Sequence, residues 1–279
     1  MTTWQDYSSY RGNHPHTVQG DVRVLTGLKS QQLNNQRDLL VYLPPSYQES
    51  DKRYPVLYMQ DGQNLFDATT SFAGEWQVDE TMESLSQEGL EAIVVGIPNI
   101  GENRLDEYSP YSQLKMGGGR GDQYLSFLTE TIKPLIDSSF RTCPEREHTA
   151  IFGSSMGGFI SLYGFFRYPQ IFGMVGIMSP AFWFARGALY TYVENAPFSP
   201  GKIYLDVGTR EHGGGRSKMM QSHSRRYYAS VRRMQRILVK KGYRPRHNLL
   251  YVEEKWAGHE EQAWARRLPA AFRFLLTSY

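Results

Sequence analysis

The sequence predicts an α/β protein: a mostly parallel central sheet with antiparallel strands at its N-terminal edge and helices on both faces. Short apolar runs alternate with helix-like stretches over most of the 279 residues, a pattern typical of a parallel sheet covered on both sides. The two leading runs follow each other without a helix between them, which indicates an antiparallel edge. No repeat and no low-complexity linker divides the chain, so we expect one domain over residues 1–279, with 1–20 as a polar extension.

The elements are expected in alternating order along the chain. Pro44 and Pro45 end the second strand because proline cannot donate to a ladder, and Asp61-Gly62 is a turn signal after the third. Apolar residues recur at helical spacing in the second helix. The expected strands are Val22–Leu25, Arg37–Leu43, Tyr54–Met59, Ala92–Ile97, Ala150–Phe152, Phe172–Ser179, Lys202–Val207 and Asn248–Glu253, and the expected helices are Thr81–Glu88, Gly121–Ile136, Met156–Phe166, Ser222–Lys241 and Glu260–Leu276.

Composition excludes several classes of function. The net charge of +3 is too small to indicate nucleic-acid binding by itself. The longest apolar run, Ile171–Met178, is far shorter than the ~20 residues of a membrane helix. The single Cys143 excludes an intrachain disulfide and a cysteine-based zinc site, and residues 1–19 lack the apolar segment of a secretory signal. We expect a cytoplasmic protein with no cofactor, metal, nucleic-acid or membrane partner; the oligomeric state stays open.

A nucleophile motif follows the Ala150–Phe152 strand. Gly153-Ser154-Ser155-Met156-Gly157 fits G-x-S-x-G with Ser155 at its centre, between a strand and a helix as that motif requires. The glycines leave room for a sharp turn, and the start of the helix favours developing negative charge at the hydroxyl. The alternative is a flexible turn without a catalytic role. We interpret Ser155 as a catalytic nucleophile.

A serine nucleophile needs a base, and the base needs an orienting acid; in this fold class these follow in the order serine, acid, histidine. His259 comes directly after Gly258, between a strand and the last helix, so it is the expected base. The acid should follow the Lys202–Val207 strand. Glu211 lies beyond the Gly208-Thr209 turn and is favoured, whereas Asp206 lies inside the apolar run and is the alternative.

Two backbone N–H groups are expected to form an oxyanion hole. One belongs to Met156, the residue after the nucleophile, and the other to the loop after the Tyr54–Met59 strand, where Gln63 is the choice and Gly62 the alternative.

Several segments resemble a known family. Val41–Tyr47, Tyr54–Phe66, Gly153–Gly158, Leu205–Glu211 and Gly258-His259 are similar to the family named Putative esterase, the α/β hydrolases around esterase D with siderophore, feruloyl and acetylxylan esterases and mycolyltransferases. The resemblance implies a Ser-His-acid hydrolase without metal or cofactor, and it supports Glu211 as the acid. Ser154 stands where S-formylglutathione hydrolases of this group carry histidine, which counts against that activity.

We therefore predict a serine carboxylic-ester hydrolase that acts through an acyl-enzyme on short-to-medium or aromatic acyl esters of small molecules. The candidate substrate-binding residues are Trp76, Arg104, Tyr108 and Trp183, with ordinary packing as the alternative for each. An acyltransferase of the same fold, a siderophore esterase and a non-catalytic binding protein are the competing hypotheses.

Overall fold

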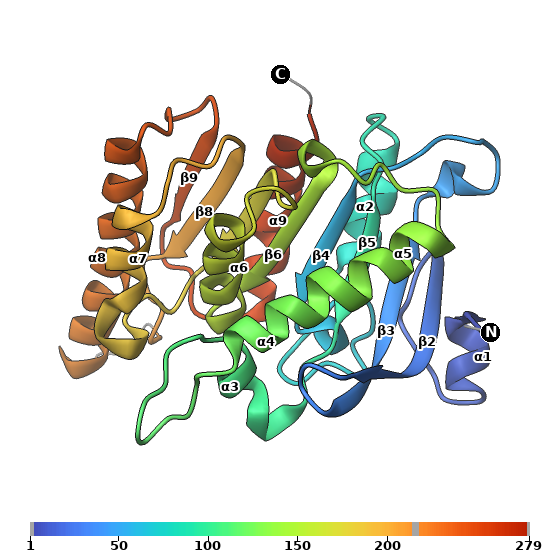
Figure 1. Ribbon diagram of the computed structural model, residues 1–279, viewed down its shortest axis with the longest axis horizontal. Coiled ribbons are helices and arrows are strands. Elements are labelled where there is room, and N and C mark those ends of the chain that lie inside the picture. Colours follow the sequence, from blue (N-terminus) through green and yellow to red (C-terminus); the bar gives the residue numbers. More distant parts are fainter. Residues whose placement is uncertain (1–2, 214–217, 278–279) are drawn as a thin grey trace.

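A single mixed sheet organises the computed structural model, which describes residues 3–213 and 218–277. The strand order is β1-β2-β3-β5-β4-β6-β7-β8-β9 (Figure 1). Neighbouring strands are antiparallel from β1 to β5 and parallel from β5 to β9, so the predicted fold class is confirmed. The strands are β1 Gln5–Asp6, β2 Asp21–Ser30, β3 Asn35–Leu43, β4 Val56–Gln60, β5 Ile93–Ile97, β6 Thr149–Ser154, β7 Met174–Met178, β8 Lys202–Gly208 and β9 Leu249–Glu254.

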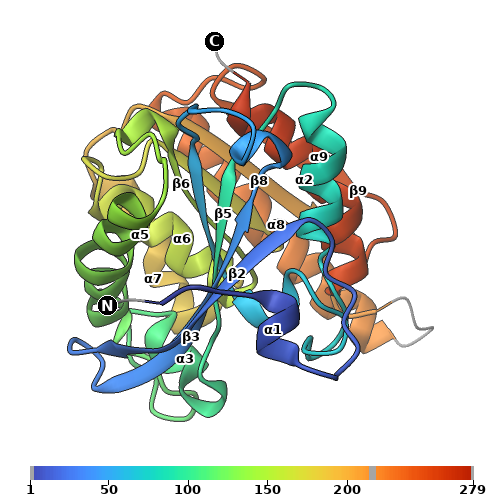
Figure 2. The same cartoon turned by 90° about the vertical axis from the view of Figure 1, so that its right-hand side faces the viewer.

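Helices cover both faces of this sheet (Figure 2). Helices α4 to α8 pack in one apolar core, and α1, α2 and α9 pack in the other. Within the described residues, none of them has the length and apolarity needed to cross a bilayer. The helices are α1 Tyr7–Arg11, α2 Val78–Ser86, α3 Arg104–Glu107, α4 Gly121–Ser126, α5 Lys133–Ser139, α6 Met156–Arg167, α7 Ala188–Asn195, α8 Lys218–Lys241 and α9 Glu261–Leu276, with the shorter turns η1 Pro45–Tyr47, η2 Gly62–Asn64, η3 Gly101–Asn103, η5 Arg146–His148 and η6 Phe184–Gly187.

The predicted helix over Gly121–Ile136 is present but interrupted. A π-helical segment, η4 (Phe127–Ile132), joins α4 to α5. A π-helical turn contains more residues than an α-helical turn, which changes the side chains that face the sheet. The spacing of apolar residues in the sequence does not reveal this π-helical segment.

Alternation along the strands divides the two cores. In β4, Val56 and Tyr58 face the core of α4 to α8, and Leu57 and Met59 face the core of α2 and α9. Because successive strand residues point to opposite faces and both faces are covered, the whole of β4 is apolar or buried. The carboxyl ends of the parallel strands are thereby left as the rim where loops can gather.

The N-terminal segment is more structured than expected for a polar extension. Its described part, from residue 3, forms β1 and α1, and β1 pairs with β2. Tyr7 is buried, and its hydroxyl donates to Asp67 Oδ2 at 2.7 Å. Because Tyr7 and Asp67 lie 60 residues apart in the chain, no local pattern could predict that this segment docks on the domain.

Candidate active site

Ser155 lies at a sharp turn between β6 and α6. Its backbone has φ 55° and ψ −120°, a strained conformation for a residue with a side chain. The turn brings β6 and α6 so close that a Cβ atom on Gly153 would lie 2.6 Å from the carbonyl carbon of Gly157. This explains the glycine at that motif position. The Ser155 side chain is thereby presented at the N-terminus of α6, where free N–H groups favour negative charge.

His259 and Glu211 come together beside this turn. His259 lies between β9 and α9, and its Nδ1 is 2.7 Å from Oε2 of Glu211, which follows β8. The Glu211 side chain is fully buried, whereas that of His259 is 28% exposed. The imidazole can therefore meet a substrate on one side while the carboxylate holds it on the other.

Asp206, the alternative acid, lies elsewhere in the hydrogen-bond network. It is fully buried in β8 and accepts from the Arg267 Nε at 2.9 Å, the Ser179 N–H at 3.0 Å and the Tyr204 hydroxyl at 3.0 Å. Burial raises the pKa of Asp206 to about 6, against the opposing effect of Arg267. Of the two carboxylates, Glu211 and not Asp206 is the one bonded to His259.

A cavity of about 400 Å³ opens at this end of the sheet and contains both Ser155 and His259. Phe72 and Trp264 give it aromatic walls, and Arg104 and Glu261 give it charge. Burial raises the pKa of Glu261. The lining residues are Asp61, Gln63, Asn64, Phe72, Asn99, Gly101, Arg104, Ser154, Ser155, His259, Glu261 and Trp264.

The loop expected to supply an oxyanion donor forms one wall of the cavity. Gln63 lines the cavity from the short helical turn η2, and Met156 is the first residue of α6. Gly62 packs directly on β5, since a Cβ atom there would lie 2.6 Å from the Ile97 nitrogen. Gln63 thus shares the cavity with Ser155, and Met156 follows Ser155 in the chain. The N–H groups of Gln63 and Met156 stay our candidates for the oxyanion hole.

Arg104 and Tyr108 support this loop from behind. The Arg104 guanidinium donates to both carboxylate oxygens of Asp61, at 2.7 and 2.8 Å. The Tyr108 hydroxyl accepts from the Asp61 N–H at 3.1 Å. Asp61 itself has a left-handed backbone, with φ 57°. Arg104 reaches the cavity and uses two of its five N–H donors on Asp61, whereas Tyr108 is fully buried.

The structure does not bring all the predicted substrate residues into the cavity. Trp76 is 1% exposed and packs against Trp264, with 5.4 Å between ring centroids. Among the described residues that line the cavity, Trp76, Tyr108 and Trp183 are absent. Trp76 and Tyr108 are large aromatic side chains buried in the core, so ordinary packing, the alternative to substrate binding, describes both. Trp183 is 47% exposed and stays available to a ligand.

Sequence reasoning missed Trp264 and Tyr227, two aromatic neighbours of His259. The Trp264 ring centroid lies 5.0 Å from that of His259, and the Tyr227 ring centroid lies 5.4 Å from it. Trp264 is on the first turns of the predicted last helix, so its closeness to His259 could have been inferred. Tyr227 comes from α8, far away in sequence, and no signal in the sequence indicates its position.

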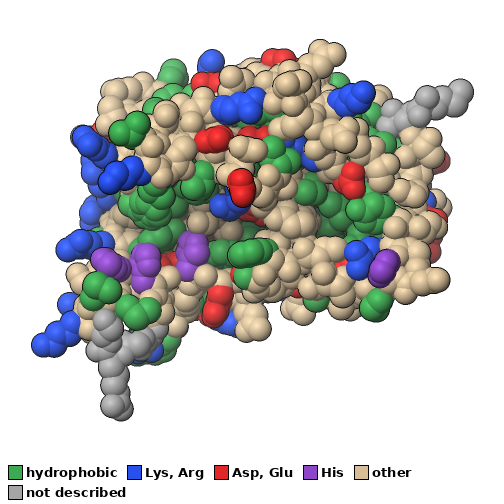
Figure 3. Space-filling model, turned by 90° about the horizontal axis from the view of Figure 1, so that it is seen from below, with side chains coloured by type: hydrophobic (Ala, Val, Ile, Leu, Met, Phe, Trp, Pro, Cys, Tyr) green, Lys and Arg blue, Asp and Glu red, His purple; other side chains and the backbone are tan. Residues whose placement is uncertain are grey.

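Histidine side chains gather on the face seen in Figure 3. The His212 ring lies 5.6 Å from that of His223 and 5.6 Å from that of Tyr227, which separates it from His259. Burial, together with the neighbouring His223 and His259, lowers the pKa of His212. These surroundings therefore favour the neutral form of His212.

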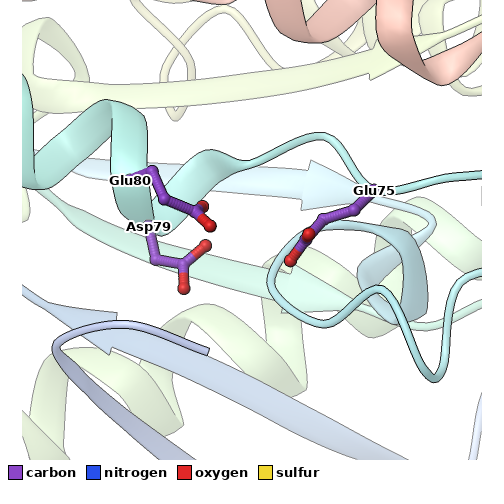
Figure 4. Close-up of side chains that lie close together, drawn as sticks. All are labelled: Glu75, Asp79 and Glu80. Carbon is purple, nitrogen blue, oxygen red and sulfur yellow. The ribbon is translucent and has the colours of Figure 1, made fainter. Parts of the chain in front are cut away.

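A group of carboxylates lies at the start of α2. Figure 4 shows Asp79 and Glu80, both on α2, side by side with Glu75 turned toward them, and oxygens of the three lie within 4.8 Å of one another. Among the described residues, Asp79 Oδ1 and Glu80 Oε2 lack a hydrogen-bond partner. Burial, then Glu80, raises the pKa of Asp79 to about 9. Such oxygens could hold a hard divalent cation or share a proton.

Comparison with known proteins identifies the family. Residues 30–275 match the model of the family described as Putative esterase. The chain belongs to this esterase family. This agrees with the resemblance carried by the sequence motifs, and it makes the protein an ester hydrolase.

The match to this esterase covers a different share of each relative. The Bacillus subtilis protein named Uncharacterized protein YbbA is 28% identical over 258 residues, 90% of this chain and 97% of that protein. The Iron(III) enterobactin esterase of Dickeya dadantii is 27% identical over 92% of this chain and 56% of that enzyme. The endo-1,4-beta-xylanase/feruloyl esterase of Xylanibacter ruminicola is 25% identical over 78% of this chain and 28% of that enzyme.

A solved structure shares the fold of the esterase along its whole length. The BES protein from Bacillus cereus has a TM-score of 0.71 at 19% identity, and the match covers 95% of this chain and 98% of that protein. At this identity the likeness shows a shared fold.

Proposed function

We propose that this esterase cleaves carboxylic esters through an acyl-enzyme on Ser155, with His259 as general base and acid and Glu211 as the orienting acid. The single observation that carries the proposal is the 2.7 Å hydrogen bond between His259 and Glu211, in the cavity that also contains Ser155 on its strained turn. A nucleophile, a base and an acid in chain order are the minimum that acyl transfer needs.

In the proposed mechanism each of the three groups has its own task. The His259 Nδ1–H donates to Glu211, which leaves Nε2 to take the Ser155 proton. The Ser155 oxygen then bonds to the ester carbonyl carbon, and the carbonyl electron pair moves to its oxygen, where the Met156 and Gln63 N–H groups would stabilise it. Collapse breaks the bond to the alcohol, which receives the proton from His259. A water molecule then attacks the acyl-enzyme and gives its proton to His259. The bond to the Ser155 oxygen breaks, the carboxylic acid product is released, and Ser155 regains its proton from His259.

The cavity supports small acyl groups. Its volume of about 400 Å³ is at the small end of the ~300–1,000 Å³ typical of ligand sites. Phe72 and Trp264 offer apolar surface to a short-to-medium chain or an aromatic acyl group. A feruloyl esterase among the relatives supports the aromatic choice. We propose that Arg104 and the exposed Trp183 contact the substrate, whereas Trp76 and Tyr108 act from behind it.

A siderophore ester is the second candidate, and its support is the enterobactin esterase among the relatives. Rates on p-nitrophenyl acetate, butyrate and octanoate, on methyl ferulate and on a tricatecholate lactone compare the two. We expect turnover of several simple esters; turnover of the lactone alone would favour the siderophore activity. Products formed with added alcohols separate hydrolysis from acyl transfer.

Labelling by a fluorophosphonate tests the nucleophile itself. The native protein should be labelled and Ser155→Ala should not, with both variants folded by circular dichroism. The exposed Ser138→Ala is the matched control and should label like the native protein. Absence of labelling of the native protein would favour a non-catalytic binding protein.

A further inference from the structure

Ser179 is a buried hydroxyl group behind the candidate acid. It follows β7 directly, is fully buried and has φ 40°. Each of its polar groups is engaged. Its N–H donates to Asp206 Oδ1 at 3.0 Å, and its carbonyl accepts from the Tyr227 hydroxyl at 2.7 Å. Its Oγ lies 2.7 Å from Glu211 Oε1 and 3.0 Å from the Arg267 Nη2.

The chemistry of the two Oγ partners fixes the direction of the hydroxyl proton. A guanidinium only donates hydrogen bonds, so Ser179 must accept from Arg267. Its one proton is then left for Glu211, which as a carboxylate only accepts. Arg267 is itself held by its ion pair with Asp206 at 2.9 Å, and both side chains are buried. The Asp206–Arg267 pair thus sets the hydroxyl rotor of Ser179.

This arrangement divides the two oxygens of Glu211. Oε1 accepts from the Ser179 hydroxyl and from the Gly208 N–H, the latter at 2.5 Å. Oε2 is the oxygen that meets His259 Nδ1. A carboxylate with two donors on one oxygen cannot rotate without breaking both bonds. The donors therefore keep Oε2 directed at the imidazole.

We propose that Ser179 is a positioning residue that orients Glu211 toward His259, and that the buried Asp206–Arg267 pair holds Ser179 in the donating state. The inference rests on the proposed function, because it assigns Ser179 a role only through Glu211. It also accounts for a buried charged pair between β8 and α9 next to the site, which packing alone does not require.

Comparing a glycine with an alanine substitution separates the effect of losing the Ser179 hydroxyl from the effect of backbone strain. Because φ is positive at Ser179, Ser179→Gly removes the hydroxyl and relieves the strain, whereas Ser179→Ala removes the hydroxyl and keeps it. We expect kcat on p-nitrophenyl butyrate to fall about 10- to 100-fold in both variants, as for loss of one hydrogen bond to a charged group. KM should stay within about twofold, since Ser179 does not line the cavity.

A double-mutant cycle shows whether Ser179 acts through Glu211. In a Glu211→Ala background there is no carboxylate to orient, so adding Ser179→Gly should leave the residual kcat unchanged. A role in general packing would instead lower kcat by the same factor in both backgrounds. That additive result, or a wild-type kcat for Ser179→Gly, would overturn the proposal.

Two reference measurements distinguish a failure of the proposed function from a failure of the proposed role of Ser179. If the native protein hydrolyses no ester, or Ser155→Ala is as active as the native protein, the proposed function fails. If the native enzyme is active and Ser155→Ala is not, but Ser179→Gly retains full kcat, only the role of Ser179 fails. Circular dichroism and the Tm of each variant confirm that rates are compared between folded proteins.

Discussion

Glu211 uses its two carboxylate oxygens for different tasks. Oε1 accepts from Ser179 and from the backbone of Gly208, and Oε2 faces His259. Asp206, five residues earlier, uses its oxygens on Arg267, Tyr204 and the backbone of Ser179. The two carboxylates therefore have different hydrogen-bond partners, and substitutions should separate their effects.

Glu211→Gln should lower kcat by ~10⁴ with little change in Tm. The donors on Oε1 require an acceptor, so the amide oxygen will take that place and the amide nitrogen will face His259. The imidazole then accepts at Nδ1 and carries its proton on Nε2, where it cannot act as a base. Steady-state rates and thermal melts of the purified variant check this. A fully active, normally folded Glu211→Gln would contradict the assignment of the acid.

Asp206→Asn should mainly affect stability. It removes the buried one of the two carboxylates that pair with Arg267, which is 5% exposed; the other, on Glu254, stays 2.9 Å away. Leaving a buried charge with no partner costs about 3–5 kcal/mol, and because Glu254 remains we expect a smaller loss here. Urea denaturation measures the loss. The kcat of the folded variant should fall far less than that of Glu211→Gln. If Asp206→Asn is stable and inactive, the roles of the two carboxylates are reversed.

Among the elements, the loop after β4 depends on a side chain from α3. The forked contact of Arg104 with Asp61 holds η2, which carries Gln63, against the end of β5. Lysine keeps the charge but cannot make two parallel hydrogen bonds. Oxyanion donors need accurate placement.

Arg104→Lys should therefore lower kcat about tenfold, by misplacing the Gln63 N–H. The matched control is Arg167→Lys, because Arg167 pairs with Asp122 at the surface and its replacement should leave the rate unchanged. Equal rates for both variants would show that the Asp61–Arg104 contact does not support catalysis.

The carboxylates at the start of α2 should make the free energy of unfolding depend on pH. Asp79 has a pKa of about 9 in the folded protein against an ordinary value of 3.8, so between these values the folded state holds a proton that the unfolded chain lacks. Stability therefore falls as pH rises through this window, and the loss is complete above pH 9. Asp79→Asn, whose amide can donate to Glu80 in place of the proton, should flatten the dependence of Tm on pH.

Thermal melts between pH 5.5 and 9 test this, with exposed Asp51→Asn as the control. An unchanged slope for Asp79→Asn would contradict a shared proton at Asp79 and Glu80. A rise in the native Tm with added Ca²⁺, lost in Asp79→Asn, would instead show that these carboxylates bind a cation.

At the scale of the whole molecule, the sheet extends past the parallel strands to a docked N-terminal segment. Deleting residues 1–19 removes β1, α1 and the donors that Tyr7 gives Asp67 and Gln19 gives Asp79. We expect a loss of more than about 2 kcal/mol in unfolding free energy, since two buried carboxylates lose donors.

Tyr7→Phe, which removes one hydroxyl, should lose about 1–3 kcal/mol by itself. Chemical denaturation of the truncated chain, Tyr7→Phe and the native protein gives the comparison. A truncated chain as stable as the native one would mean that residues 1–19 are the simple polar extension that composition suggests.

The sequence by itself determined the sheet class, most element positions and the Ser155 turn, because these depend on periodicity, glycines and proline within a few residues of one another. It also limited the acid to Asp206 or Glu211, since the first lies in the Lys202–Val207 strand and the second lies just after it. His259 stood out by its place between a strand and the last helix. The candidate nucleophile and base can thus be predicted from local pattern, and the acid as one of two residues.

Only the tertiary structure shows which of the two carboxylates is bonded to His259, because this depends on partners from distant segments: Ser179, Arg267 and His259. It also placed Trp76 and Tyr108 in the core and Tyr227 against His259. Burial of an aromatic side chain or pairing of a charge is decided by elements that meet in space. The sequence does not show which elements meet, so the hydrogen-bond network around Asp206 and Glu211 becomes visible only in the packed structure.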